Sequence, residues 1–172
     1  MLYILSDNCK HLNYDKFKLY MKNFIKLNNM KISLINSKNF DPWKRTKISI
    51  KFIILHYTGM QSERESIKRL CDPKSKVSSH FVINKKGQIY RLVQENRIAW
   101  HAGKSCWGKY KNLNRNSIGI ELVNKGHDFG YTIFPKKQLS SLTKICKKLI
   151  KKYKIKKKNV IGHSDVAPLR KI

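Results

Sequence analysis

Apolar residues recur along this chain with the two periods that distinguish strands from helices. A buried strand is predicted where alternation turns into the continuous run FIIL, shortly before Gly59. A pair of strands is predicted on either side of a short turn that contains Gly87. The segments predicted to contain strands are 48–59 (ISIKFIILHYTG), 78–93 (SSHFVINKKGQIYRLV), 117–124 (SIGIELVN) and 159–165 (NVIGHSD).

Two other segments have helical spacing. In residues 62–73, Ser62 and Glu65 have the spacing of a capping box, and the helix is predicted to end before Pro73. Residues 135–153 place apolar side chains three or four positions apart on one predicted helix face. Because strands and helices mix without a regular βαβ repeat, the sequence predicts a mixed α/β fold, with a central mixed β-sheet flanked by helices in a single domain.

The length of 172 residues suits one domain with a proper core. Residues 1–29 are polar and basic with scattered aromatics, and the composition of the sequence changes at Met30. We interpret 1–29 as an N-terminal extension, or the result of an upstream start, and 30–172 as the functional domain. The four cysteines are widely spaced without a CxxC pair, which favours reduced thiols over a disulfide framework or a zinc finger.

The N-terminal residues do not have the pattern of a secretory or lipoprotein signal. No apolar run approaches the roughly 20 residues that span a bilayer. We therefore expect a cytoplasmic protein without a membrane span, or a periplasmic one if the true N-terminus differs from Met1.

The charge of the chain is strongly one-sided. Lys and Arg total 38 against 10 Asp and Glu, which gives a formal net charge of +28. Such an excess is compatible with nucleic-acid binding, and equally with attraction to acidic cell-wall peptides or anionic surfaces. The lysines are spread along the chain, and the densest cluster, 147–158, lies at the end of a predicted helix where cations suit the helix dipole. We therefore expect no specific nucleic-acid site.

Three polar residues interrupt predicted core strands. His56 follows FIIL, Glu121 lies within SIGIELV, and His163 follows VIG. A glutamate in an apolar strand is costly to bury unless it is paired or lies near a metal. Histidines at strand ends can converge on one side of a sheet and bind zinc, but each could equally be a satisfied structural residue. Spacing alone leaves both interpretations open.

Five blocks of the sequence carry a resemblance to a known family. They are FIILHYTGM, VSSHFVINKKGQIYRLV, RIAWHAGKSCW, NSIGIELVN followed by GHDFGY, and VIGHSDVAPLRK. In this order they resemble the zinc-dependent N-acetylmuramoyl-L-alanine amidases, and in particular the bacterial muropeptide amidases, which are related to phage amidases and peptidoglycan-recognition proteins. The resemblance covers roughly residues 30–172 and implies the amidase fold.

The resemblance also implies a site. His56 and His163 match the two zinc-ligand histidines, Glu121 matches the acidic residue that takes the water proton, and Lys171 matches the lysine that stabilises the oxyanion. The implied reaction is Zn²⁺-assisted hydrolysis of the amide bond between N-acetylmuramic acid and L-alanine, and the implied partner is peptidoglycan or a muropeptide. The family's third ligand is an aspartate two residues after that lysine, whereas the sequence ends at Ile172. We therefore expect an apparently truncated domain that hydrolyses muropeptides poorly unless this aspartate is restored.

Other residues carry weaker predictions. Tyr57, Trp100 and His101 are candidates for substrate binding. Tyr57 and Trp100 could equally be core residues, and His101 could instead hydrogen-bond a residue that binds the metal. His80 is predicted to be structural, and Asp165 to stabilise a turn. Two alternatives to the enzyme stay open: a non-catalytic peptidoglycan-binding module, because the third ligand is absent, and a basic nucleic-acid-binding protein.

Overall fold

A computed structural model describes residues 30–169 of the chain, so the predicted extension 1–29 lies outside the described residues. The main sheet has six strands in the order β1-β4-β3-β7-β2-β8. Only the β3–β4 pair is antiparallel, and the other four pairs of this sheet are parallel. The strands are β1 Ile32–Leu34, β2 Phe52–Tyr57, β3 Phe81–Ile83, β4 Ile89–Arg91, β7 Ser117–Leu122 and β8 Val160–Gly162. The predicted mixed sheet is therefore confirmed.

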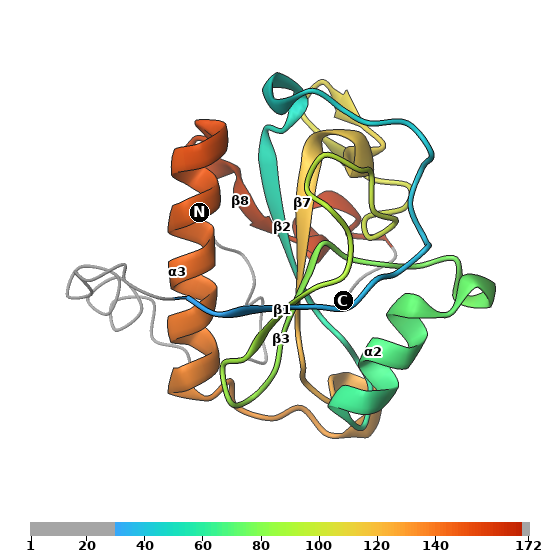
Figure 1. Cartoon of the computed structure of the whole chain (residues 1–172), viewed down its shortest axis with the longest axis vertical. Coiled ribbons are helices and arrows are strands. Elements are labelled where there is room, and N and C mark those ends of the chain that lie inside the picture. The colour runs from blue at the N-terminus through green and yellow to red at the C-terminus, as the bar shows by residue number, and fades with distance from the viewer. Residues whose placement is uncertain (1–29, 170–172) are drawn as a thin grey trace.

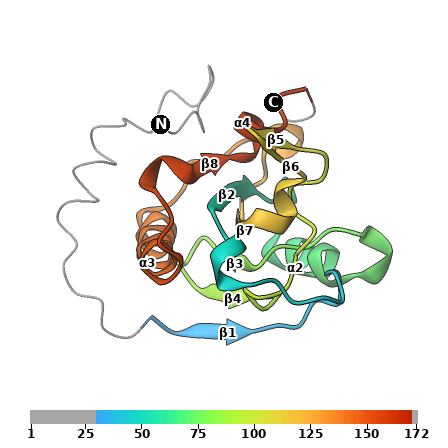
Figure 2. The same cartoon turned by 90° about the horizontal axis from the view of Figure 1, so that it is seen from above.

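Helices cover both faces of this sheet (Figures 1 and 2). In the view from above, α3 lies on one side of the strands and α2 on the other (Figure 2). A small separate hairpin pairs β5 with β6 and contacts α4. The helices and the hairpin strands are α2 Glu63–Cys71, α3 Lys136–Tyr153, α4 His163–Val166, the 3₁₀ turns η1 Lys47–Ser49, η2 Pro73–Ser75, η3 Leu113–Asn116, η4 His127–Phe129 and η5 Lys157–Asn159, and the strands β5 Cys106–Trp107 and β6 Tyr110–Lys111.

Local sequence signals explain where α2 and the β3–β4 hairpin form. The Ser62 hydroxyl accepts a hydrogen bond from the Glu65 backbone N–H at 3.2 Å, as a capping serine does. Gly87 adopts a positive φ of 85°, and its ideal Cβ would lie 2.7 Å from the Lys137 carbonyl oxygen, so a side chain there would meet the start of α3. The Ser62 cap and the turn at Gly87 are both confirmed.

The two faces of the sheet follow from strand alternation. On β2, Ile53 and Leu55 point toward α3 and pack against its buried side chains, such as Ile145. We call this side the α3 face. Phe52, Ile54 and His56 occupy the opposite side, which we call the His56 face; the first two belong to a separate core cluster with Ala102, Leu113, Ile161 and Val166.

One element boundary differs from the prediction and affects the site. The last strand ends at Gly162, and His163 is the first residue of α4 rather than the end of a strand. The reason is local: Asp165 Oδ2 accepts a hydrogen bond from the Gly162 N–H at 2.8 Å, which turns the chain into the helix. Asp165 thus has its predicted turn-stabilising role. Within residues 30–169, no helix has the length and apolar character needed to cross a membrane.

Candidate active site

Three neighbouring strands bring His56, Glu121 and His163 to one place. β2 lies between β7 and β8, and His56 is the register partner of Glu121 on β7. On the other side, Leu55 pairs with Gly162, so His163 follows directly beyond that pair. The Nδ1 atoms of His56 and His163 lie 2.9 Å apart. The structure therefore brings together the two histidines that the resemblance assigns to zinc, with Glu121 beside them.

His101 lies behind His56 and completes a buried row of polar contacts. Its Nδ1 atom lies 3.0 Å from His56 Nε2, and its Nε2 atom lies 3.1 Å from the Ser117 hydroxyl. The imidazole packs directly over Gly119, where an ideal Cβ would lie only 2.4 Å from His101 Cγ. A glycine at this strand position is therefore needed for the ring to approach the sheet.

Two of these imidazoles are held neutral by their surroundings. Burial lowers the pKa of His101 well below its ordinary value, and the nearby His80, Arg45 and His163 lower it further. Burial likewise lowers the pKa of His80, with the Arg45 guanidinium as the next cause. His80 Nδ1 accepts a hydrogen bond from the Gly119 N–H at 3.0 Å, and its Nε2 lies 3.1 Å from the Arg97 carbonyl oxygen. His80 is fully buried, as expected of a structural residue.

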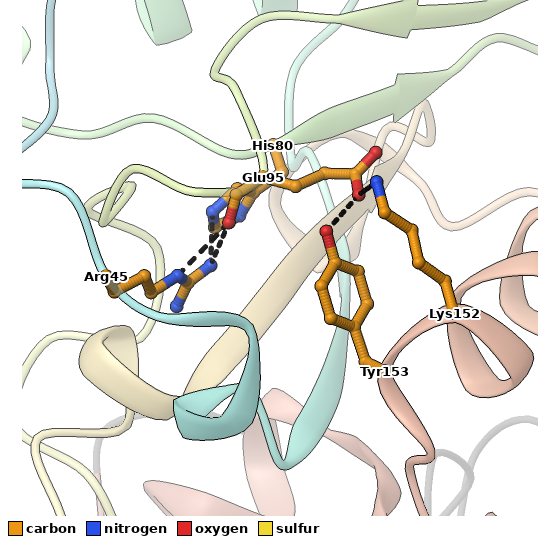
Figure 3. Close-up of polar contacts among 5 residues, drawn as sticks. All are labelled: Arg45, His80, Glu95, Lys152 and Tyr153. Atoms are coloured by element: carbon orange, nitrogen blue, oxygen red, sulfur yellow. Dashed lines mark hydrogen bonds and ion pairs between the residues drawn. The ribbon is translucent and has the colours of Figure 1, made fainter.

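A partly buried arginine, Arg45, contacts His80 beside this group of histidines. Arg45 donates hydrogen bonds to the carbonyl oxygens of Glu95 and Asn114, and its Nη2 atom lies 2.8 Å from His80 Nε2 (Figure 3). Burial lowers the Arg45 pKa to about 10, so the side chain stays charged near neutral pH. The Glu95 carboxylate reaches the other way, to Lys152 at 2.5 Å and to the Tyr153 hydroxyl, and so links this loop to the end of α3.

Two of the remaining predicted site residues, Tyr57 and Trp100, lie apart from this row of contacts. Tyr57 points to the α3 face, where its hydroxyl lies 2.8 Å from His127 Nδ1 and its ring packs on Tyr131. Trp100 donates from Nε1 to Asp41 Oδ1 at 2.7 Å. Their roles in substrate binding stay predictions, and Lys171 lies outside the described residues.

Sequence reasoning missed Ser117, Gly119 and Arg45. A glycine within the predicted strand SIGIEL was a usable signal, because glycine inside a strand often marks a close approach of another group. Ser117 could have been noticed as a polar residue two positions before that glycine, and thus on the same face. Arg45 carried no signal among so many basic residues.

The two facing imidazole nitrogens of His56 and His163 suit a zinc-type ion. Neutral imidazole nitrogens are preferred zinc ligands, and His56 and His163 present one nitrogen each toward a common point. Among residues 30–169, no group of three or more His, Cys, Asp or Glu side chains is gathered to hold a metal ion. These two histidines are therefore the candidate metal ligands within the described part of the chain.

Comparisons with known proteins identify the family of the chain. The family model described as N-acetylmuramoyl-L-alanine amidase matches residues 45–172. The chain is 38% identical over 134 residues to N-acetylmuramoyl-L-alanine amidase AmiD of Escherichia coli (strain K12), which covers 71% of this chain and 48% of that protein. It is 30% identical over 156 residues to the 1,6-anhydro-N-acetylmuramyl-L-alanine amidase AmpD of Haemophilus influenzae, covering 80% of this chain and 82% of that protein.

A solved structure of a relative has the same fold. The complex of AmiD from E. coli with the substrate anhydro-N-acetylmuramic acid-L-Ala-D-γ-Glu-L-Lys superposes with a TM-score of 0.64 at 35% identity, over 76% of this chain and 54% of that one. The chain thus spans about half the length of AmiD. The family match over most of the chain, together with these relatives, confirms the predicted resemblance: the chain belongs to the N-acetylmuramoyl-L-alanine amidase family.

Proposed function

We propose that this protein hydrolyses the amide bond between N-acetylmuramic acid and L-alanine in muropeptides or peptidoglycan, with Zn²⁺ held by His56 and His163. The observation that carries the proposal is the 2.9 Å approach of the two Nδ1 atoms, with Glu121 in register beside His56. The family assignment favours this hydrolase over the peptidoglycan-binding and nucleic-acid-binding alternatives.

The positions of the two histidines fit the proposed ion. Zinc–nitrogen bonds of about 2.0–2.1 Å at a tetrahedral angle place two ligand nitrogens about 3.3 Å apart. The observed separation of 2.9 Å is a few tenths of an ångström shorter, an adjustment that side-chain rotation can supply. A third ligand stays a prediction from the resemblance.

The chemistry that Zn²⁺ supplies in such a site is Lewis-acid polarisation of the scissile carbonyl and a lowered pKa of water. The proposed role of Glu121 as general base is supported by its register pairing with His56 and by its buried Oε2 atom. The water oxygen forms the new C–O bond of the muramic carboxylate, and the C–N bond to alanine breaks. Glu121 takes the water proton and returns it to the alanine amine.

The substrate class of the proposal follows from the relatives. AmpD of H. influenzae is named for 1,6-anhydro-N-acetylmuramyl-L-alanine, and the AmiD complex holds an anhydro-muramyl tripeptide. We therefore choose anhydro-N-acetylmuramyl-L-Ala-D-γ-Glu-L-Lys as the first probe, and intact peptidoglycan as the second.

The test is release of the free tripeptide, measured by liquid chromatography and mass spectrometry with zinc-loaded protein. We expect Glu121→Gln to release the tripeptide at least about 100-fold more slowly than the same chain with Glu121, when both carry the aspartate that the resemblance predicts two residues after Lys171, because removing a positioned general base costs on the order of 10²–10⁴ in rate. His56→Ala should lose activity together with bound zinc. Ser37→Ala is a control away from the site, since the Ser37 hydroxyl donates to the Leu70 carbonyl oxygen and accepts from the Asn39 N–H. Equal release by wild type and Glu121→Gln would refute the assignment of the base.

A further inference from the structure

The Ser117 hydroxyl determines which nitrogen of His101 carries a proton. Ser117 Oγ lies 2.6 Å from the Leu113 carbonyl oxygen, which can only accept a hydrogen bond, so the hydroxyl hydrogen points there. The same oxygen lies 3.1 Å from His101 Nε2 and must accept from it. The neutral His101 ring is therefore protonated on Nε2, and its Nδ1 is an acceptor.

The tautomer of His101 determines the tautomer of His56. A cationic His101 is disfavoured because the side chain is buried, so its Nδ1 stays an acceptor. His56 Nε2, 3.0 Å away, must then donate to it. A neutral imidazole carries one proton, so the lone pair of His56 lies on Nδ1, the atom that faces His163.

His163 has the same tautomer as His56, fixed by a different hydrogen bond. Its Nε2 atom lies 3.3 Å from the Ala102 carbonyl oxygen, so this nitrogen donates and Nδ1 holds the lone pair. Two acceptor nitrogens thus face each other at 2.9 Å. Two facing lone pairs are favourable when a cation lies between the two nitrogen atoms. Two N–H groups in the same positions would repel a cation.

We propose that His101 and Ser117 are positioning residues that hold His56 in the Nε2–H tautomer, so that its Nδ1 is presented as a metal ligand. The purpose of this relay rests on the proposed function, but the tautomer itself does not. Metal-ligating histidines commonly donate their other ring N–H to a carboxylate or a carbonyl, which fixes the tautomer and the ring plane. In this protein a second buried histidine takes that position.

The fold keeps the relay in place through the neighbouring backbone. The Asn114 side-chain oxygen accepts hydrogen bonds from the N–H groups of His101 and Ala102, at 3.1 and 2.7 Å. Ser117 and Gly119 lie on the same side of β7 as Glu121, because they alternate along one strand. The His101 ring therefore lies between a backbone clamp and the two small residues of that face, Ser117 and Gly119.

The decisive measurement is a long-range ¹H–¹⁵N correlation spectrum of the metal-free wild-type protein near neutral pH. A protonated Nε2 and an unprotonated Nδ1 on His56 and His101 would support the relay. A His56 ring with its proton on Nδ1 would overturn it, whatever the protein does with metal. This spectrum needs no variant, so a folding defect cannot obscure the answer.

Zinc affinity, measured by competition with a chromogenic chelator, tests the purpose. His101→Phe removes the nitrogen that accepts from His56 and keeps a ring, and we expect zinc binding to weaken about 10–100-fold. Ser117→Ala removes the group that fixes the proton on His101 Nε2, and we expect zinc binding to weaken several-fold. Ser37→Ala is the matched control, because that buried hydroxyl also donates to a carbonyl, at Leu70, and accepts from an N–H, at Asn39, outside the relay. Affinity that stays within twofold of wild type in both relay variants would overturn the positioning role. A wild type that binds no zinc but keeps the Nε2–H tautomer would refute the zinc proposal and leave the relay standing.

Discussion

Gly119→Ala tests the contacts of His101 with His56 and Ser117 most directly, because the added methyl group would collide with the His101 ring. The ideal Cβ at Gly119 would lie 2.4 Å from His101 Cγ and 2.7 Å from its Nδ1 and Cδ2. Ordinary van der Waals contact begins at 3.4 Å, so the ring must retreat by about 1 Å. Gly119 does not have a positive φ, so alanine introduces no backbone strain and the effect comes from the contact alone.

The magnitude follows from what that retreat disrupts. A displacement of about 1 Å would stretch the 3.0 Å contact to His56 and the 3.1 Å contact to Ser117 beyond hydrogen-bonding range. Each lost hydrogen bond costs about 1 kcal/mol, and overpacking a core site costs about 1–3 kcal/mol. We therefore expect the free energy of unfolding to fall by about 3–5 kcal/mol, measured by urea denaturation.

A double-mutant cycle separates this contact from other effects of the alanine. In a His101→Ala background the added methyl group has room, so Gly119→Ala should change the free energy of unfolding by less than about 1 kcal/mol. The coupling energy between the two positions should therefore exceed about 1 kcal/mol. If Gly119→Ala costs the same in both backgrounds, the close approach of His101 to the strand is not the cause.

Three further predictions address the surroundings of the site by urea denaturation. Ser62→Ala should lower the free energy of unfolding by about 0.5–2 kcal/mol, because it removes the cap on the Glu65 N–H, and no loss would contradict that cap. Arg45→Met should cost at least about 2 kcal/mol by leaving two part-buried carbonyl groups without their donor, whereas Lys152→Met, at a half-exposed ion pair, should cost less than about 1 kcal/mol. Since burial and Arg45 lower the folded pKa of His80, the unfolded state binds its proton first as pH falls below about 6.5, and stability decreases there by about 1.4 kcal/mol per pH unit. His80→Asn should remove that part of the slope, and an unchanged slope would contradict the lowered pKa.

The sequence predicted the elements whose signals are local. The capping serine of α2, the turn at Gly87 and the apolar spacing of α3 each depend on residues close together in the chain, and each prediction holds. The end of the last strand was predicted less well, because the Asp165 carboxylate turns the backbone at Gly162 through a single hydrogen bond.

The candidate site was predictable only in its most distinctive residues. His56, Glu121 and His163 are recognisable because each is a polar residue at the end of an apolar run or within one. The contacts behind them depend on strand register and on a loop that returns over β7, which no local pattern encodes. His101 could therefore be named as a candidate, but its position against His56 and Ser117 required the fold.

The alternation of β7 ties the placement of the site to the stability of the core. Ile118, Ile120 and Leu122 point to the α3 face, while Ser117, Gly119 and Glu121 point to the His56 face. A slip of one residue in register would exchange the two sets. Removing the three apolar side chains from their core would cost about 5–9 kcal/mol at about 1.5–3 kcal/mol each, and the Glu121 carboxylate would be buried against α3. That penalty is comparable to the whole stability of a typical domain, so the apolar residues on one face of β7 also fix where the polar residues of the other face lie.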